Sequence, residues 1–496
     1  MNLATIIEGH PDDAVALVSR GQPTTYGELR AQVAALRGGL TGLGLEPGDR
    51  IGVAAGNNWY FVVSYLAAVG AGLVAVPLNP ANPSAAMAHE LGGVGAAAVV
   101  VGPAARSSFE EIDRAELPSL RHVIGCGFTP EGGTELDGLL GAAPTPVVDR
   151  DPSDLAVLIY TSGTAGAPRA AMLTHANLYT NIRQVLAAGT DLQRDDDIGF
   201  GLLPLFHIFG LNVVLGCSLA VGARVVLVER FDPVSALEAI ALHRMTIVSG
   251  PPTMWAAFAG IPGIDAEAFS SVRLAVSGAA KLPVEVFQAV EARFGLHLDE
   301  GYGLTEASPV VTTSTGTGAP PGSVGIPVPG VELRLVDPDG ADVLVGDTGE
   351  LWVRGPNVFA GYWEDEEATA KVLGGDGWLR TGDMAVVDDN GFLFLVDRAK
   401  DLIIVSGFNV FPAEVEDVLL EHPAVEACAV VGVPHPYTGE SVKAYVKARP
   451  GISVEEDDVI AFCAERLARY KCPNKVWFVD DLPRGLTGKV LRRLLS

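Results

Sequence analysis

The first of four short segments that could handle a phosphate covers residues 160–169, YTSGTAGAPR. It directly follows an apolar run, LAVLIY, over residues 155–160. Glycine lets the backbone approach a ligand closely, so successive N–H groups and hydroxyls of such a loop can bind a polyphosphate. The spacing is not that of the GxxxxGK[ST] phosphate loop. A flexible surface turn is therefore the competing interpretation of this segment.

A second segment, EGYGLTE over residues 300–306, places an aromatic ring between two glycines. The Tyr302 ring could lie flat on a nucleotide base. The hydroxyl and carboxylate that follow, on Thr305 and Glu306, could reach a phosphate and its Mg²⁺, because Mg²⁺ prefers oxygen ligands. A buried tyrosine beside an ordinary loop is the alternative.

The remaining two segments supply a carboxylate and a cation. In GWLRTGD, residues 377–383, Asp383 could accept both hydroxyls of a ribose, although a turn carboxylate often only caps its own backbone. The tail segment PRGLTGK ends in Lys489, a lone cation on a glycine-bearing turn. Taken alone, that lysine is best explained as a solvated surface residue.

The elements that must position these segments alternate between helices and buried strands. Thr25 and Glu28 form a capping-box pattern before a helix whose apolar face repeats every three or four residues. Several strand-length runs are continuously hydrophobic, as strands covered on both faces are. These runs cover residues 223–228, 246–250, 273–278 and 392–396.

The order of strand, glycine loop, helix and strand predicts an α/β fold with doubly wound parallel sheets. Residues 319–363 are dense in proline and glycine and predict an antiparallel, β-rich subdomain. The pattern changes again near residues 398–400. We therefore expect a large N-terminal domain over residues 1–398 and a small α+β C-terminal domain over 399–496; that the small domain is mobile is implied only by the family resemblance given below.

The composition excludes several classes of protein. Of 496 residues, 48% are hydrophobic and 19% are charged, which is typical of a well-filled globular chain rather than a disordered one. A net charge of −26 argues against broad contact with nucleic acid. The last 96 residues are nearly balanced, with 11 basic and 14 acidic side chains. This contrast predicts a separate electrostatic role for the C-terminal part.

Cysteine usage and the N-terminus predict a cytoplasmic location. The five cysteines are scattered and never spaced CxxC, so neither a disulfide framework nor a zinc site is expected. The first residues lack the basic and apolar regions of a signal peptide. Residues 61–78 are mostly apolar, but Gly70, Gly72 and Pro77 interrupt them. We expect a buried helix followed by a strand there, and no transmembrane segment.

In this order and spacing, the four segments resemble the adenylate-forming (ANL) superfamily over about residues 25–489. YTSGTxGxP, PLFHIFG (204–210), DRAKDLIIVSGFNVFPAEVE (397–416) and PxxxTGK look most like its fatty acid–CoA ligase branch. The resemblance implies an AMP-forming acid–thiol ligase with ATP, Mg²⁺ and coenzyme A as its cofactor and co-substrates. A carboxylate would attack the α-phosphate of ATP to give acyl-AMP and pyrophosphate. The thiol of coenzyme A would then displace AMP.

The resemblance also implies a substrate and leaves two alternatives open. The leading interpretation is a medium- or long-chain fatty acid. An aryl or other carboxylate is the first alternative, and delivery of the acyl group from acyl-AMP to a carrier protein is the second. Chain length, peripheral contact with a membrane, and the choice between monomer and homodimer stay open at this stage.

Site residues carried over by motif fall into five groups. The catalytic group is Lys489, Thr305, Glu306 and His207, and the metal ligands are Glu306 and Thr161. Lys400 is the hinge about which the C-terminal domain rotates, and Ser406, Gly407 and Phe408 then reach coenzyme A. The ATP- and AMP-binding group is Thr161, Ser162, Gly163, Thr164, Gly166, Arg169, Gly278, Ala279, Ala280, Glu300, Gly301, Tyr302, Gly303, Thr305, Asp383 and Arg398.

Two positions need separate comment. Arg169 and Ala170 stand where the superfamily usually has Lys-Gly, and an arginine fork is not equivalent to a lysine ammonium. With 26 arginines and eight lysines in the chain, compositional bias is the simpler explanation.

His207 is expected to pack and gate rather than act as a base, because a carboxylate nucleophile needs no deprotonation. The resemblance places the acyl tunnel near residues 207–218, 250–258 and 300–310, which contain small and bulky residues such as Gly210, Trp255 and Ala307, and the sequence leaves open which of them face the cavity.

Overall fold

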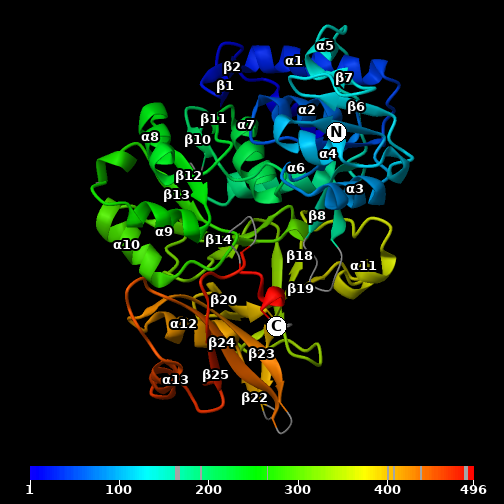
Figure 1. The fold of residues 1–496 in the computed structure, drawn as a ribbon. Helices are drawn as coiled ribbons and strands as arrows, with labels where there is room; N and C mark the ends of the chain where they lie inside the picture. The colour runs from blue at the N-terminus through cyan, green and yellow to red at the C-terminus, as the bar shows by residue number, and fades with distance from the viewer. Residues whose placement is uncertain are drawn as a thin grey trace.

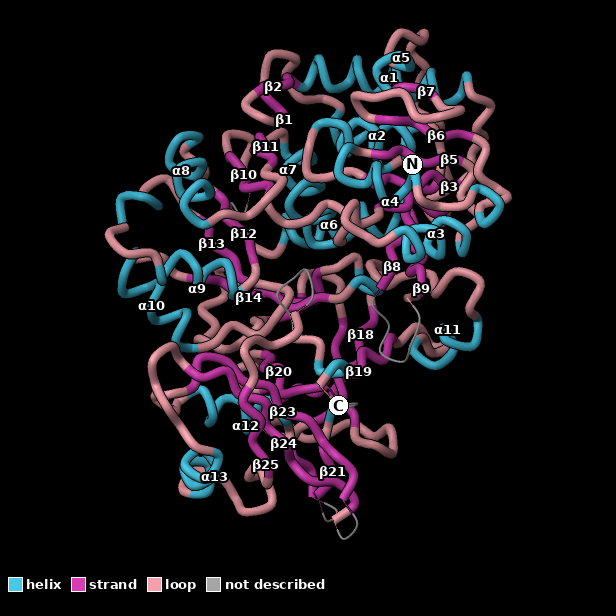
Figure 2. The backbone as a smooth tube through the Cα atoms, viewed as in Figure 1, coloured by secondary structure: helices cyan, strands magenta, loops and turns pink. Residues whose placement is uncertain are grey.

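The computed structural model describes residues 1–161, 168–189, 193–264, 266–398, 401–405, 408–435, 438–484 and 490–495. These residues form four sheets with helices packed around them, and the chain passes from one sheet to the next as Figures 1 and 2 show. The fold is α/β, with a large N-terminal domain and a smaller C-terminal domain.

The first large sheet has seven strands in the order β7-β6-β5-β3-β4-β8-β9. Its neighbours are parallel except for the β8–β9 pair, which is antiparallel. The strands are β3 (Arg50–Ala54), β4 (Val74–Pro77), β5 (Ala98–Val101), β6 (His122–Gly125), β7 (Thr134–Glu135), β8 (Leu155–Thr161) and β9 (Arg169–Thr174). The nearby helices are α1 (Tyr26–Gly42), α2 (Trp59–Gly70), α3 (Ser84–Gly93), α4 (Arg106–Glu110) and α5 (Leu136–Leu139).

The second large sheet has nine strands in the order β16-β15-β14-β13-β12-β10-β11-β1-β2, and its central pairs are parallel. The strands are β1 (Val15–Ser19), β2 (Gln22–Thr25), β10 (Ile198–Gly201), β11 (Arg224–Leu227), β12 (Ile247–Gly250), β13 (Leu274–Ser277), β14 (Leu298–Gly303), β15 (Val310–Thr313) and β16 (Ile326–Pro327). Its helices are the π-helix η4 (Phe209–Cys217), α7 (Ser218–Val221), α8 (Pro233–His243), α9 (Pro252–Gly260) and α10 (Val284–Phe294). Helix α6 (His175–Ala187) lies between η4 and strands β8 and β9 of the first sheet.

Two smaller sheets complete the chain. An antiparallel sheet contains β17 (Glu332–Val336), β18 (Gly349–Arg354), β19 (Leu379–Val387) and β20 (Leu393–Arg398), with α11 (Glu366–Val372) beside it. The C-terminal sheet contains β21 (Ile403–Val405), β22 (Phe408–Val410), β23 (Val425–His435), β24 (Gly439–Ala448) and β25 (Lys475–Phe478). It packs with α12 (Pro412–Leu420) and α13 (Glu456–Ala464), and in Figure 1 this orange and red part lies below the blue and green sheets.

The local sequence signals explain where these elements begin. The Thr25 hydroxyl accepts the Glu28 N–H, and the Glu28 carboxylate accepts the Thr25 N–H, so the predicted capping box starts α1. The apolar stretch over residues 61–78 divides into α2 and β4, as predicted. In the part of the chain that the structure describes, no helix is both long enough and apolar enough to cross a membrane.

The buried side chains form separate cores, which keeps the C-terminal sheet distinct. One large core joins α1, α2 and the seven-stranded sheet to α6 and η4. A second lies under β12 and β13 around Trp255 and Phe258. The C-terminal sheet has its own core, which includes Val415, Val430 and Val442. The boundary predicted after residue 398 falls beside residues 399–400, which lie outside the described residues.

Candidate active site

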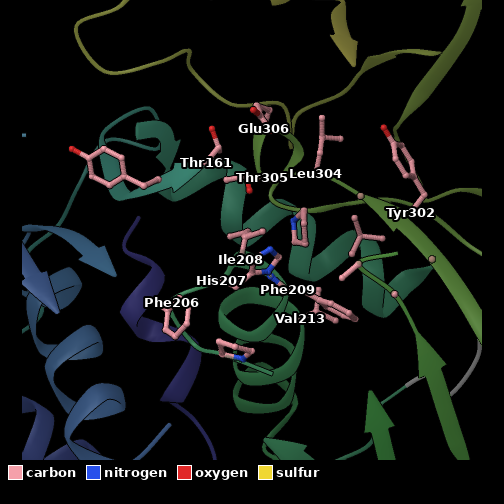
Figure 3. Close-up of a pocket in the computed structure, with 18 of the residues that line it drawn as sticks. Thr161, Phe206, His207, Ile208, Phe209, Val213, Tyr302, Leu304, Thr305 and Glu306 are labelled. Atoms are coloured by element: carbon pink, nitrogen blue, oxygen red, sulfur yellow. The ribbon is translucent and has the colours of Figure 1, made fainter. Parts of the chain in front are cut away.

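A cavity of about 1300 Å³ lies where the two large sheets and the C-terminal domain meet. Its wall includes Thr161 at the end of β8, the Gly301–Glu306 stretch at the end of β14, and residues 206–209 before and within η4. Parallel sheets collect ligands at the carboxyl ends of their strands. Figure 3 shows Thr161, Thr305 and Glu306 together on one side of this pocket, with His207 and Phe209 below them.

The phosphate-loop segment is anchored at both ends by paired strands. Thr161 and Arg169 are partners in the antiparallel register of β8 and β9, so the loop between them leaves and re-enters the sheet at one point. Thr161 and Arg169 both line the cavity. The predicted ligands Ser162, Gly163, Thr164 and Gly166 lie outside the described residues.

The Glu306 side chain is held by a tyrosine that sequence reasoning missed. The Tyr362 hydroxyl donates a hydrogen bond to Glu306 Oε1 at 2.6 Å. The Phe359 N–H also donates to the Glu306 carbonyl at 2.8 Å, so one segment holds both the backbone and the carboxylate. Burial raises the pKa of the Tyr362 hydroxyl, as does the Glu306 carboxylate, so this hydroxyl stays a donor. Among the described residues, no hydrogen bond to the second carboxylate oxygen of Glu306 is found.

The arginine that replaces the usual lysine is part of the same arrangement. Arg169 Nε donates to Asp365 Oδ2 at 2.8 Å, and the guanidinium lies 5.9 Å from the centre of the Tyr362 ring. The arginine pairing lowers the pKa of the Asp365 carboxyl, as does a backbone hydrogen bond from Ala368. Thus Arg169 is tied to the start of α11. Nothing in the spacing of the sequence could show this, because 196 residues separate the two partners.

The predicted nucleotide residues on β14 and β19 also meet. The Tyr302 hydroxyl donates to Asp383 Oδ2 at 2.6 Å, and both residues are more than nine-tenths buried. Asp383 faces Arg398 in the register of β19 and β20. The structure thereby brings Tyr302, Asp383 and the backbone of Arg398, three of the predicted ATP- and AMP-binding residues, close to one another.

Only two of the three residues predicted to lie along the edge of the adenine, Gly278, Ala279 and Ala280, line the cavity. Gly278 and Ala279 line the cavity, whereas Ala280 is exposed and is not on its wall. A Cβ at Gly278 would lie 2.8 Å from a carbon of the Phe209 ring, so only glycine lets that ring pack here. Gly301 and Gly303 line the cavity as well.

Glu300 is turned away from the cavity wall that its neighbours form. Its carboxylate accepts the Gly322 N–H at 3.2 Å, and its side chain is buried. Burial raises the pKa of the Glu300 carboxyl to about 7. The described contacts therefore hold the Glu300 carboxylate behind the Gly301–Glu306 stretch, and Glu300 does not line the cavity.

His207 is an uncharged donor at the centre of the cavity. Burial lowers the pKa of its imidazole to about 4, so the ring is neutral at physiological pH. The Phe209 N–H donates to His207 Nδ1 at 3.3 Å, which assigns the proton to Nε2. A neutral N–H of this kind can orient a carboxylate.

The apolar part of the cavity, where the acyl tunnel was expected, differs in one wall from that prediction. Residues 206–209 and Val213 line it, as expected, but the facing wall is formed by β12 and β13. Trp255 is fully buried on the other side, where its indole N–H donates to the Val276 carbonyl. Ala307 is also fully buried, and neither residue lines the cavity. The predicted segment 300–310 does contribute to the wall, whereas the predicted segment 250–258 does not and β12 lines the cavity instead.

The C-terminal domain contributes to the same cavity. Val490, Leu491 and Arg492, which directly follow Lys489, line it, and so do Asp401, Leu402 and Ile403. Lys489, Lys400, Ser406 and Gly407 lie outside the described residues, and the side chain of Arg398 is likewise not described. Phe408 is not on the cavity wall: it is exposed and its ring stacks on Tyr470 at a centroid distance of 4.9 Å.

The residues around Glu306 fit a hard divalent cation. The Glu306 carboxylate has one oxygen held by Tyr362, and the Thr161 hydroxyl lines the same cavity. Oxygen ligands of this type suit Mg²⁺, which usually keeps several waters and binds through one or two protein groups plus phosphates. No cluster of three or more acidic, histidine or cysteine side chains that could hold a metal by itself is found among the described residues.

Comparison with known proteins agrees with this geometry. The family described as AMP-binding enzyme matches residues 3–363, and the AMP-binding enzyme C-terminal domain matches residues 414–489. A feruloyl-CoA synthase from an Amycolatopsis species is 39% identical over 481 residues, covering 97% of this chain and 94% of that protein. A long-chain-fatty-acid–CoA ligase from Bacillus subtilis is 33% identical over 521 residues, covering 97% and 91%.

A solved structure gives the same result for the fold. An anthranilate CoA ligase, AuaEII, in complex with anthranoyl-AMP superposes with a TM-score of 0.93 at 29% identity, covering 100% of this chain and 96% of that one. The chain therefore belongs to the AMP-binding enzyme family, in the adenylate-forming superfamily. Within that family it is an ATP-dependent, AMP-forming acyl-CoA ligase.

Proposed function

We propose that the chain activates an elongated, largely apolar carboxylic acid, with a medium- or long-chain fatty acid as the first candidate. The observation that carries the proposal is one continuous cavity. Its phosphate end contains Thr161, Thr305 and Glu306, and an apolar channel continues from it between η4 and β12–β13. Burial of each CH₂ group in such a channel contributes about 0.8 kcal/mol, which favours long acids over acetate.

In this proposal each residue has a defined task. The neutral Nε2–H of His207 orients the carboxylate, and Thr305 contacts the α-phosphate that the carboxylate attacks. Glu306, positioned by Tyr362, would hold Mg²⁺, which supplies charge neutralisation to the phosphates when bound. Asp383 and Arg398 would bind the ribose, with Tyr302 against the base. Positioning and electrostatics dominate, since phosphoryl chemistry needs little else from the protein.

The second half-reaction is proposed to need a different pose of the C-terminal domain. In the described pose, the residues just after Lys489 line the cavity, whereas Phe408 is outside it. Rotation about Lys400 would withdraw Lys489 and bring the segment around Ser406 and Gly407 to the channel for coenzyme A. Lys281 and Asp417, the latter on α12, form an exposed ion pair at 2.7 Å, which such a rotation would break at little cost.

A hydroxylated aryl-propenoic acid is the second candidate. It is favoured by the 39% identity to a feruloyl-CoA synthase and by the aromatic rings of Phe206 and Phe209 on the wall of the channel. Flat aromatic acids pack well against such rings.

Exchange of labelled pyrophosphate into ATP tests the proposal. The panel consists of acetate, octanoate, dodecanoate, benzoate and cinnamate, each measured with and without coenzyme A. We expect exchange with the elongated acids, and thioester formation when coenzyme A is present. Preference for acetate or benzoate over every longer acid contradicts the proposal. Exchange without any thioester on addition of coenzyme A would favour a carrier protein as the acceptor.

A further inference from the structure

The loop that follows β14, and that carries Thr305 and Glu306, is held in place by buried side chains. Three asparagines, each no more than 2% exposed, donate hydrogen bonds to the backbone carbonyls that come after Glu306. The pairs are Asn357 with Ala307 at 2.8 Å, Asn212 with Ser308 at 2.7 Å, and Asn181 with Val310 at 2.8 Å. A buried carbonyl that loses its partner is costly, so these three amides fix the path of the loop.

Asn212 connects this loop to the helix that forms one wall of the apolar channel. It belongs to η4, in which Phe209 and Val213 line the cavity. Figure 3 shows these two residues below Thr305 and Glu306. A single buried side chain therefore joins the wall that would contact the acid to the loop that would contact the phosphates.

The hydrogen bond from Asn212 reaches a residue whose backbone needs outside support. Ser308 is fully buried and has a φ of +70°, in the left-handed region that residues other than glycine disfavour. Its N–H donates to the Thr305 carbonyl at 3.2 Å, so the turn at Ser308 closes on the residue expected to contact the α-phosphate. The Asn212 amide also donates to the Leu178 carbonyl of α6 at 3.1 Å, which fixes the orientation of the amide. A change at Asn212 should therefore displace the turn that carries Thr305.

Acyl-AMP formation requires two separately bound groups to be aligned. In the proposed mechanism, His207, two residues before η4, orients the carboxylate, whereas Thr305 on the loop contacts the α-phosphate. A displacement of about 1 Å between two such groups can cost a factor of about 100 in rate, because the reacting atoms must lie roughly 3–3.5 Å apart. In the second half-reaction the acyl group and AMP are one molecule, so the two walls no longer have to align them.

We propose that Asn212 is a positioning residue for acyl-AMP formation, which keeps the channel helix η4 in register with the loop that carries Thr305 and Glu306. It acts through the Ser308 carbonyl and does not touch the reacting atoms. This inference rests on the proposed roles of Thr305 and Glu306, and it holds for any acid that enters the channel. It predicts that Asn212 is needed for one half-reaction only.

Asn212→Leu tests this proposal, because leucine has nearly the same shape as asparagine and no donor. Two rates are measured: exchange of labelled pyrophosphate into ATP with the acid that the unmodified enzyme uses best, and formation of acyl-CoA from the matching acyl-AMP and coenzyme A. At saturating ATP, Mg²⁺ and acid, we expect exchange to fall about 10- to 100-fold, while acyl-CoA formation changes less than about threefold. Added Mg²⁺ should not restore exchange, because Tyr362 and Phe359 still hold Glu306.

Asn212→Ser is the second variant, and it keeps the test decisive if Asn212→Leu does not fold. Its hydroxyl lies on a side chain one atom shorter than that of asparagine, so it cannot bind the Ser308 and Leu178 carbonyls together. This variant should separate the two half-reactions in the same direction.

Asn2→Leu is the matched control. Asn2 is 4% exposed, and its amide donates to the carbonyls of Val69 and Val148 at 2.9 Å each, away from the active-site cavity. This variant should unfold at a lower urea concentration, because two buried carbonyls lose their partner. Both of its half-reactions should stay within about twofold of the unmodified enzyme, since surroundings far from the cavity are affected.

Three outcomes would contradict the account. An equal fall of both half-reactions in folded Asn212→Leu and Asn212→Ser overturns the inference, because the role of Asn212 is then only structural. Unchanged exchange in both variants also overturns it and leaves the proposed function intact. Normal exchange in Thr305→Ala and in Glu306→Gln at limiting Mg²⁺ instead overturns the proposed roles of those two residues.

Discussion

The hydrogen bond from Tyr362 to Glu306 gives a prediction that separates positioning from folding. Tyr362→Phe removes one oxygen and keeps the ring on which the Arg169 guanidinium lies. The lost bond is 2.6 Å long and its acceptor is a carboxylate. Hydrogen bonds to charged groups contribute about 1.5–3 kcal/mol. If that energy holds Glu306 in its metal-binding position, the variant should lose about 10- to 100-fold in acyl-AMP formation at low Mg²⁺.

Two measurements should be made on the variant. The rate of pyrophosphate release is followed over a range of free Mg²⁺, and we expect the half-saturating concentration to rise while the rate at high Mg²⁺ partly recovers. Binding of Mn²⁺ to the enzyme–ATP complex, followed by electron paramagnetic resonance, should weaken in parallel. This second readout does not depend on turnover.

A matched variant controls for the loss of a buried tyrosine hydroxyl. Tyr26 donates to the Ala223 carbonyl at 2.8 Å, away from the cavity. Tyr26→Phe should lower the free energy of unfolding by about 1 kcal/mol and leave the Mg²⁺ dependence unchanged. An unaltered Mg²⁺ dependence in Tyr362→Phe, with normal Mn²⁺ binding, would refute the positioning role.

Three further predictions concern other groups. Glu306→Gln should keep the fold yet abolish most adenylation, with added Mg²⁺ restoring some activity; normal turnover at limiting Mg²⁺ would remove Glu306 from the metal site. Lys489→Ala should slow acyl-AMP formation by a factor of about 10²–10³, while supplied acyl-AMP and coenzyme A still react. Lys400→Pro should instead slow the reaction of acyl-AMP with coenzyme A more than acyl-AMP formation. Equal damage to both half-reactions would count against domain rotation. Burial lowers the pKa of His175 to about 4, so its neutral form stabilises the fold above pH 6.5 and that contribution is lost as the pH falls towards 4. When the pH is lowered from 7 to 5, the free energy of unfolding, measured with urea, should fall by about 2 kcal/mol more in the unmodified chain than in His175→Asn. An equal fall in the two proteins would contradict this.

Sequence patterns predicted those parts of the molecule that local chemistry determines. The capping box at Thr25 starts α1 because both of its hydrogen bonds form within four residues. The break between α2 and β4 follows from Gly72, because its positive φ is one that glycine adopts readily and that ends a helix. The strand that precedes the phosphate loop was identified from its continuous apolar run, because a strand covered on both faces must be apolar throughout.

The contacts that were missed are those between segments distant in the sequence. Tyr362 reaches Glu306 across 56 residues, and Asp365 reaches Arg169 across 196. No spacing rule links such positions, since sheet order alone decides which loops meet. The side on which Trp255 lies was left open for the same reason. An aromatic residue after a strand fits either face of the sheet, and the packing of α9 places this one in the core.

Transfer of oxygen from the acid to AMP tests the central claim most directly. The acid, labelled with oxygen-18 in its carboxylate, is incubated with the enzyme, ATP, Mg²⁺ and coenzyme A, and the products are analysed by mass spectrometry. If the carboxylate attacks the α-phosphate, each acyl-CoA formed is accompanied by one AMP that carries one labelled oxygen. Formation of ADP, or of AMP without the label, would contradict the account.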